Sequence, residues 1–247
     1  MTVDDLLASL ALPAQTRVDQ RVAKKLLLDN GAPTAADKRA ITDGIEELLW
    51  VAALKPATVG VPIYEDAERQ YLEIAVLTLA LRSGAKANRL RELIHRAIPY
   101  PVVLVTAEPD TITLSLAEIR HAQNEAGKMV LDGDVHAAAL PDGLVGDAFR
   151  ATLPLTGLPS GNLRLLYRGW LDRLTNLEVA GITGSLPQGD NAAQRRDALR
   201  TIRQLDVALV DLRYEAERET QINRRVELNL ELKQREAERA RLVALLG

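Results

Sequence analysis

The acidic residues that best fit a catalytic pair are Asp66 and Glu73. A metal-dependent nuclease of the Asp…Glu-x-Lys type needs an acid on one strand, then Glu, one residue and Lys on the next. Such groups hold a divalent ion and activate water. Here the residue two positions after Glu73 is Ala75, so the lysine is missing. The pair is therefore kept as the enzymatic alternative, and the leading hypothesis assigns no catalytic residue.

Other catalytic and metal-binding signatures are absent from the sequence. None of His95, His121 and His136 has another ligand type at metal spacing, and the chain contains no cysteine. There is no P-loop, no Gly-x-Gly-x-x-Gly after a strand and no Gly-x-Ser-x-Gly elbow. We expect neither a metal ion nor a cofactor.

The charge distribution gives only weak support to nucleic-acid binding. From Arg195 onward the chain holds 12 Lys+Arg against 10 Asp+Glu, whereas the whole chain has a formal net charge of −3. Proteins that bind nucleic acid usually carry a clearly basic stripe. The candidate patch is a small basic group, read either as a solvated surface or as phosphate contacts: Lys24, Lys25, Lys38 and Arg39.

The elements that would position these residues form an α+β body over residues 1–158. Thr34 predicts the start of an amphipathic helix, and Lys55-Pro56 predicts its end. An interior strand is predicted over Tyr71–Leu81, then a helix capped by Asn88. The apolar face of the first helix consists of Ile41, Ile45, Leu48, Leu49 and Ala52.

Turn residues predict antiparallel strands after a second strand at Val102–Thr106. Thr111–Leu116 alternates after the turn Glu108-Pro109-Asp110. A second hairpin is predicted between Lys128–Leu131 and Val135–Leu140, which flank Asp132-Gly133. The fold class is therefore α+β, with a small mixed or antiparallel sheet and helices packed on it.

Residues 159–247 are predicted to form a helical hairpin with one long, coiled-coil-like helix. Asp190–Leu246 has neither proline nor glycine, which predicts one uninterrupted helix. Its apolar seam passes through Ile202 and Leu209, meets polar Glu219 and Asn223, and recovers at Val226, Leu230 and Ala237. The polar gap either sets register or partner choice, or marks where the helix leaves the body and faces water.

Several segments together resemble the bacterial domain-of-unknown-function family numbered 4391, over nearly the whole chain. The most specific are the Ile-Pro-Tyr-Pro corner and the Gln-x-Asn-Arg-x-Val-Glu-x-Asn motif in the tail. The segments that carry the resemblance, in order, are Val22–Leu28, Glu46–Pro56, Tyr71–Val76, Ile94–Pro101 and Glu219–Asn229.

This resemblance implies an accessory role. Members are often encoded beside large helicases and DNA methyltransferases in mobile defence regions, so it implies a partner of that kind in an anti-phage or restriction-like system. We expect six residues of the tail, named the tail motif below, to bind this partner; the alternative is that they brace the long helix against the preceding one. They are Gln221, Asn223, Arg224, Arg225, Glu227 and Asn229.

The leading hypothesis is a non-enzymatic adaptor that docks a protein partner through its C-terminal helices. A metal-dependent nuclease and a nucleic-acid-binding subunit are the alternatives, and a homodimer through the long helix is also considered. The first residues carry no basic region of a signal peptide, and no apolar run reaches membrane length. We therefore expect a cytoplasmic protein without a membrane segment.

Overall fold

The computed structural model describes residues 2–125, 127–189 and 191–246. Its contacts divide the chain into two units, Met1–Leu174 and Thr175–Gly247, and the division falls within helix α7 (Leu163–Thr183). The sequence placed this boundary earlier, after residue 158. The first half of α7 contacts the body, and the two units are described separately.

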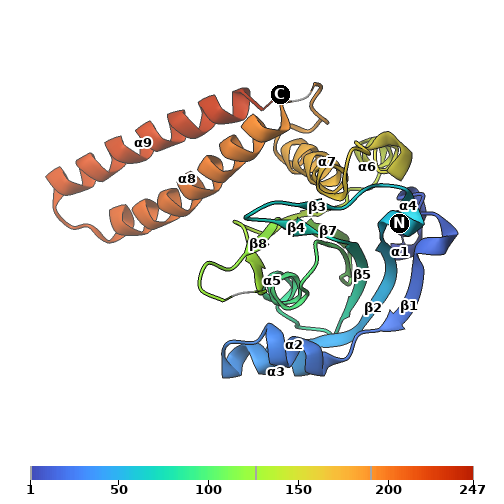
Figure 1. The fold of residues 1–247 in the computed structure, drawn as a ribbon. Coiled ribbons are helices and arrows are strands. Elements are labelled where there is room, and N and C mark those ends of the chain that lie inside the picture. Colours follow the sequence, from blue (N-terminus) through green and yellow to red (C-terminus); the bar gives the residue numbers. More distant parts are fainter. Residues whose placement is uncertain (1, 126, 190, 247) are drawn as a thin grey trace. The chain divides into compact units, whose positions relative to one another are not determined.

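The first unit is built on a six-stranded mixed sheet (Figure 1). Neighbouring strands are antiparallel except β5 and β6, which are parallel and are joined through helix α5 (Ala87–Ala97). In spatial order the strands are β1 (Arg17–Arg21), β2 (Ile45–Leu54), β5 (Ile74–Leu81), β6 (Val102–Ala107), β7 (Ile112–Leu116) and β10 (His136–Ala139). The predicted α+β class is confirmed.

Helices cover both faces of this sheet, which explains why its central strands are apolar on both sides. In Figure 1, α2 (Lys24–Asn30), α3 (Ala35–Gly44) and α5 lie on one side, with α6 (Leu144–Arg150) and α7 on the other. The core under α5 joins Leu27, Ile41, Leu77, Leu93 and Leu104, among others. The remaining helical segments are α1 (Val3–Ser9), α4 (Pro56–Val59) and the 3₁₀ turns Ala14–Thr16 and Leu155–Gly157.

The predicted helix through Ala52 is wrong beyond Gly44. Thr34 caps α3 as expected, because its hydroxyl accepts a hydrogen bond from the backbone N–H of Asp37 at 3.1 Å. From Ile45 onward the chain is strand β2, paired with both β1 and β5. The apolar spacing fits a helix, but pairing on both edges decides the conformation, and local propensity does not reveal such pairing.

Asp37, in the first turn of α3, has its pKa lowered from 3.8 to about 2, chiefly by hydrogen bonds from Arg89 and Thr34. Its carboxylate accepts bonds from Arg89 Nε at 2.7 Å and Nη2 at 3.0 Å. A carboxyl whose pKa is lowered on folding stabilises the fold above its unfolded pKa, and this contribution disappears as the pH falls through the folded value.

We therefore expect Asp37→Asn to lower the melting temperature at neutral pH. The difference from wild type should shrink between pH 4 and pH 2, as the wild-type carboxyl becomes protonated. Thermal unfolding followed by circular dichroism across this range measures the effect, with exposed Asp110→Asn as the control. A constant difference down to pH 2 would show that the Arg89 contact contributes nothing.

Two further predictions in the body are wrong. Strand β9 (Met129–Leu131) pairs with β8 (Ile119–His121), and β10 pairs with β7, so Asp132-Gly133 joins two different sheets. Helix α5 is capped at Lys86, and the Asn88 side chain instead accepts a hydrogen bond from Arg91. Besides β8–β9, a second two-stranded sheet pairs β3 (Tyr64–Glu65) with β4 (Gln70–Tyr71).

The second unit contains an antiparallel hairpin of α8 (Ala192–Arg218) and α9 (Ile222–Ala244). The prediction of one uninterrupted helix is wrong: Glu219 has an extended backbone, and the chain reverses there. Asp190, its predicted start, lies outside the described residues. The buried seam is formed by Leu209, Ala216, Leu228 and Leu232. Val226 and Leu230, which were placed on the seam, are exposed, because the reversal changes the register of α9.

Candidate functional site

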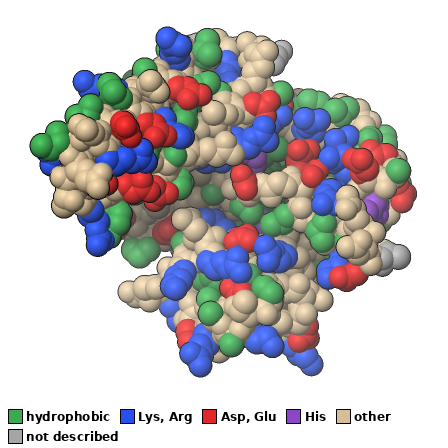
Figure 2. Space-filling model, turned by 90° about the vertical axis from the view of Figure 1, so that its left-hand side faces the viewer, with side chains coloured by type: hydrophobic (Ala, Val, Ile, Leu, Met, Phe, Trp, Pro, Cys, Tyr) green, Lys and Arg blue, Asp and Glu red, His purple; other side chains and the backbone are tan. Residues whose placement is uncertain are grey.

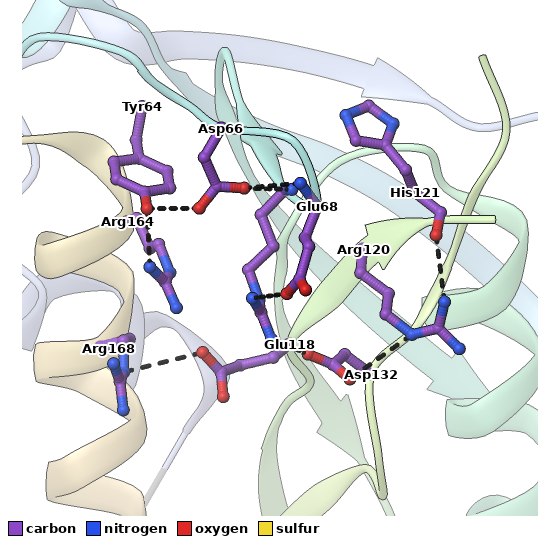
Figure 3. Close-up of polar contacts among 10 residues, drawn as sticks. Tyr64, Asp66, Glu68, Glu118, Arg120, His121, Asp132, Arg164 and Arg168 are labelled. Atoms are coloured by element: carbon purple, nitrogen blue, oxygen red, sulfur yellow. Dashed lines mark hydrogen bonds and ion pairs between the residues drawn. The ribbon is translucent and has the colours of Figure 1, made fainter. Parts of the chain in front are cut away.

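The body carries a polar cluster drawn from three parts of the chain (Figure 3). The turn between β3 and β4 supplies two acids and an arginine. Residues 118–121 and Asp132, which follows β9, supply the central side chains of the cluster. Helix α7 supplies two more arginines. Its ten residues are Tyr64, Asp66, Glu68, Arg69, Glu118, Arg120, His121, Asp132, Arg164 and Arg168.

Asp66 holds the β3–β4 turn. Its carboxylate accepts hydrogen bonds from the Tyr64 hydroxyl at 2.5 Å and from the backbone N–H groups of Glu68 at 2.8 Å and Arg69 at 2.6 Å. These bonds, that from Tyr64 first, lower the pKa of Asp66 to about 2. Carboxylates that bond to local backbone N–H groups in this way are typical of turns.

Every acid of the cluster faces an arginine, a backbone donor or a hydroxyl. Arg69 donates to Glu68 at 2.7 Å and to Asp132 at 2.5 Å. The Arg168 Nε lies 3.6 Å from Glu118. With four arginines and four acids, the cluster is formally neutral. No group of three or more potential metal-binding side chains occurs among the described residues. The arrangement crosslinks the turn to the body.

Glu73, the other candidate catalytic acid, lies between β4 and β5 rather than inside a strand. Its carboxylate is 8 % exposed and lies 2.8 Å from the Lys55 Nζ, which is 53 % exposed. The hydrogen bond to Glu73 and its charge raise the pKa of Lys55. Glu73 and Asp66 thus have separate partners, and neither lies in an open acidic cleft. The geometry favours structural roles for both.

We expect Glu73→Gln to change the free energy of unfolding by about 1 kcal/mol or less, because the Lys55 partner is half in water. Urea unfolding of Glu73→Gln, Lys55→Met and the double variant isolates the coupling between them. A folded Glu73→Gln protein that lost a metal-dependent cleavage activity of the wild type would contradict this assignment and favour the nuclease alternative.

His95 has no catalytic geometry. It is buried on α5, where its Nε2 lies 3.0 Å from the Ser115 Oγ of β7. Burial, together with the charge of Arg91, lowers its pKa to about 3. The imidazole is therefore neutral at physiological pH and joins the helix to the sheet.

The four predicted nucleic-acid contacts do not act alike. The Lys24 Nζ donates to the backbone carbonyl of Thr42 at 2.8 Å, at the end of α3, and Arg82 donates to the same oxygen at 3.2 Å. Burial, Arg82 and Arg21 lower the pKa of Lys24. Lys25, Lys38 and Arg39 are exposed. Figure 2 shows basic and acidic side chains interspersed over the face it presents.

The tail motif begins at the hairpin turn and continues into α9. Every residue from Thr220 to Glu227 is exposed, on all sides of the helix. The hydrogen bonds of its side chains are local: Arg224 donates to Glu227 at 2.9 Å, and Asn229 donates to the Arg225 carbonyl at 2.9 Å. Within the described part of the chain these side chains do not brace α9 against α8.

Sequence reasoning did not show that six apolar residues beside this motif are exposed. Val207, Val210 and Tyr214 lie on α8, and Ile222, Val226 and Leu230 lie on α9. Their 3–4 spacing is also the spacing of a buried seam, so the sequence did not distinguish the two roles. Only the position of the turn does so.

These features define an α+β protein whose C-terminal helical hairpin exposes both polar and apolar rows. The chain belongs to the family described as Domain of unknown function (DUF4391), whose model matches residues 10–238. The resemblance inferred from the sequence is thus confirmed. Comparisons with curated proteins and with solved structures gave no match. Within the residues that the structure describes, no helix is long and apolar enough to cross a membrane.

Proposed function

We propose that this protein is a non-enzymatic accessory subunit that docks a larger protein through the start of α9. The observation that carries the proposal is that every residue of Thr220–Glu227, at the end of the hairpin, is exposed. Surface helices usually bury one face. Here more than a full turn presents directional polar groups, and within the residues that the structure describes their side-chain hydrogen bonds stay inside α9.

The docking side is set by the helical register. Asn223, Arg224 and Glu227 lie on one side of α9, whereas Ile222 and Val226 lie on the other, because successive residues turn by about 100°. A guanidinium, a carboxylate and an amide together form directional hydrogen bonds with a partner. The expected partner is a large helicase or DNA methyltransferase in a defence system, which follows from the family resemblance.

Co-purification with the products of neighbouring genes tests the proposal. The variant Asn223→Ala/Arg224→Glu/Glu227→Arg keeps an oppositely charged pair three residues apart, so the helix should be retained. We expect at least a tenfold loss of partner affinity, about 1.4 kcal/mol. The matched control exchanges another exposed pair three residues apart, Asp197→Arg/Arg200→Glu on α8. Equal partner recovery from variant, control and wild type would overturn the proposed docking side.

A further inference from the structure

The outer edge of strands β9 and β10 is open within the described part of the chain. β10 is the last strand of the six-stranded sheet, and β9 belongs to the two-stranded β8–β9 sheet. The N–H of Leu140 donates to the Ile112 carbonyl of β7, and the N–H of Asp132 donates to the Glu118 carbonyl, each at 2.8 Å. Because alternate residues of a strand face opposite edges, the intervening residues turn their backbone groups outward. They are Met129 and Leu131 on β9, and Ala137 and Ala139 on β10.

The opposite edge of the six-stranded sheet is protected. β1 carries three exposed charged side chains, Arg17, Asp19 and Arg21, and its register with β2 shifts between Arg17 and Gln20. Charged side chains and bulges are devices by which edge strands avoid pairing with other chains. β10 has neither, because its sequence is His-Ala-Ala-Ala and its register with β7 is continuous. An incoming strand is therefore expected at β10 rather than at β1.

A groove runs along this open edge. Its first part lies between β9 and the end of α2, and its second part lies between α5 and the residues that join β9 to β10. Arg96 and Leu131 line both parts, so the groove is continuous. The wall from α5 is polar, because Asn88, Glu92 and Arg96 are spaced four residues apart on one side of that helix. The outward-facing backbone of β9 thus borders a groove that a further chain can enter.

The charges of the groove that lack a partner are both negative. Asp29, near the end of α2, lines its first part, and Asp134, which precedes β10, lines its second part. Both are exposed, and neither forms an ion pair within the described residues. The cations that line the groove are each paired with a glutamate three or four residues away: Arg96 with Glu92, and Lys128 with Glu125. Uncompensated carboxylates favour a chain that carries cationic side chains.

We infer that an extended, basic segment of a partner protein pairs with the β9–β10 edge and lies in this groove. Backbone hydrogen bonds to the four outward-facing residues supply affinity, and Asp29 and Asp134 select lysine or arginine. A second copy of this edge fits less well, because it would bring the same two carboxylates to the groove. The inference shares no residue with the contact proposed for α9, so either can fail without the other.

Selection of decapeptides from a random display library on the full chain tests the inference. We expect the enriched peptides to carry lysine or arginine, and Asp29→Lys/Asp134→Lys to weaken their binding at least tenfold in fluorescence anisotropy. The matched control, Asp211→Lys/Glu217→Lys, makes the same charge change at two exposed positions of α8 and should bind like wild type. Enrichment of acidic peptides or of none, or an equal loss in the control, would overturn the inference.

Removal of backbone hydrogen bonds tests strand addition. Ala137→Pro deletes an N–H that faces away from β7, so the sheet should persist, whereas the edge can no longer donate there. We expect at least tenfold weaker peptide binding, with a melting curve by circular dichroism close to that of wild type.

If Ala137→Pro does not fold, N-methylation of alternate backbone nitrogens in the peptide removes hydrogen bonds from the other partner. An N-methylated peptide that binds as tightly as its parent would overturn strand addition. The α9 variant Asn223→Ala/Arg224→Glu/Glu227→Arg should bind the peptides normally. Loss of the larger partner in that variant, with peptide binding intact, would therefore separate the two sites and support both.

Discussion

Tyr167→Phe is expected to destabilise the body by about 2–4 kcal/mol, although it removes only one oxygen atom. The fully buried Tyr167 hydroxyl accepts a hydrogen bond from the Ala117 N–H at 2.9 Å. It lies 2.8 Å from the Val102 carbonyl and 2.9 Å from the Ala117 carbonyl, to either of which it can donate. The substitution strands a buried donor and an acceptor, each costing about 1–3 kcal/mol.

The matched control is Tyr71→Phe, at a neighbouring ring 5.9 Å away. Tyr71 is equally buried, but within the described residues its hydroxyl interacts only with the Ile119 backbone and forms no well-aligned hydrogen bond. Burial raises its pKa, so the hydroxyl stays neutral. Removing an unpaired buried hydroxyl should change stability by less than about 1 kcal/mol, or increase it.

Urea unfolding followed by fluorescence and circular dichroism compares the two variants. Only the hydrogen bonds distinguish the two positions, because both substitutions remove the same atom from a buried ring. Equal losses of stability would mean that the three contacts of Tyr167 do not join α7 to the sheet. A large loss for Tyr71→Phe alone would reveal a partner for that hydroxyl.

These hydrogen bonds illustrate which parts of the fold the sequence could predict. Strands β5, β6 and β7 and helix α5 were predicted, because continuous apolar runs and proline or turn residues delimit them. Strand β2 was not, because its apolar spacing also fits a helix and its pairing partners lie elsewhere in the chain. The contact of Tyr167 with Val102 spans 65 residues, and no local pattern records it.

The same limit applied to the candidate site. The sequence singled out the tail motif, because its polar residues lie close together in the chain, and its role in binding a partner stays a prediction. It did not reveal that Asp66 holds a turn or that Arg69 joins Asp132, since that contact spans 63 residues. It also missed the reversal at Glu219, because the turn contains neither glycine nor proline. Without that turn, the exposed Val226 and Leu230 were placed on one seam with Leu209.

Leu228→Asp is expected to unfold the hairpin while the body stays folded. Leu228 is 3 % exposed and packs with Leu209, Ala216 and Leu232. Replacing it removes a core side chain and buries a carboxylate without a partner, at a cost of at least about 3 kcal/mol.

Hydrogen exchange read by mass spectrometry separates the two outcomes. Peptides from α8 and α9 should lose protection in Leu228→Asp, whereas peptides from β5 to β7 should keep it, because the hairpin lies in the second of the two units. Val226→Asp is the matched control: it places the same charge two residues away at an exposed position, and protection should remain in both units. The partner contact should disappear in Leu228→Asp, since it uses the folded hairpin. Loss of protection spreading into the central strands would show that the units fold as one, and retained binding by the unfolded hairpin would remove the helices from the docking surface.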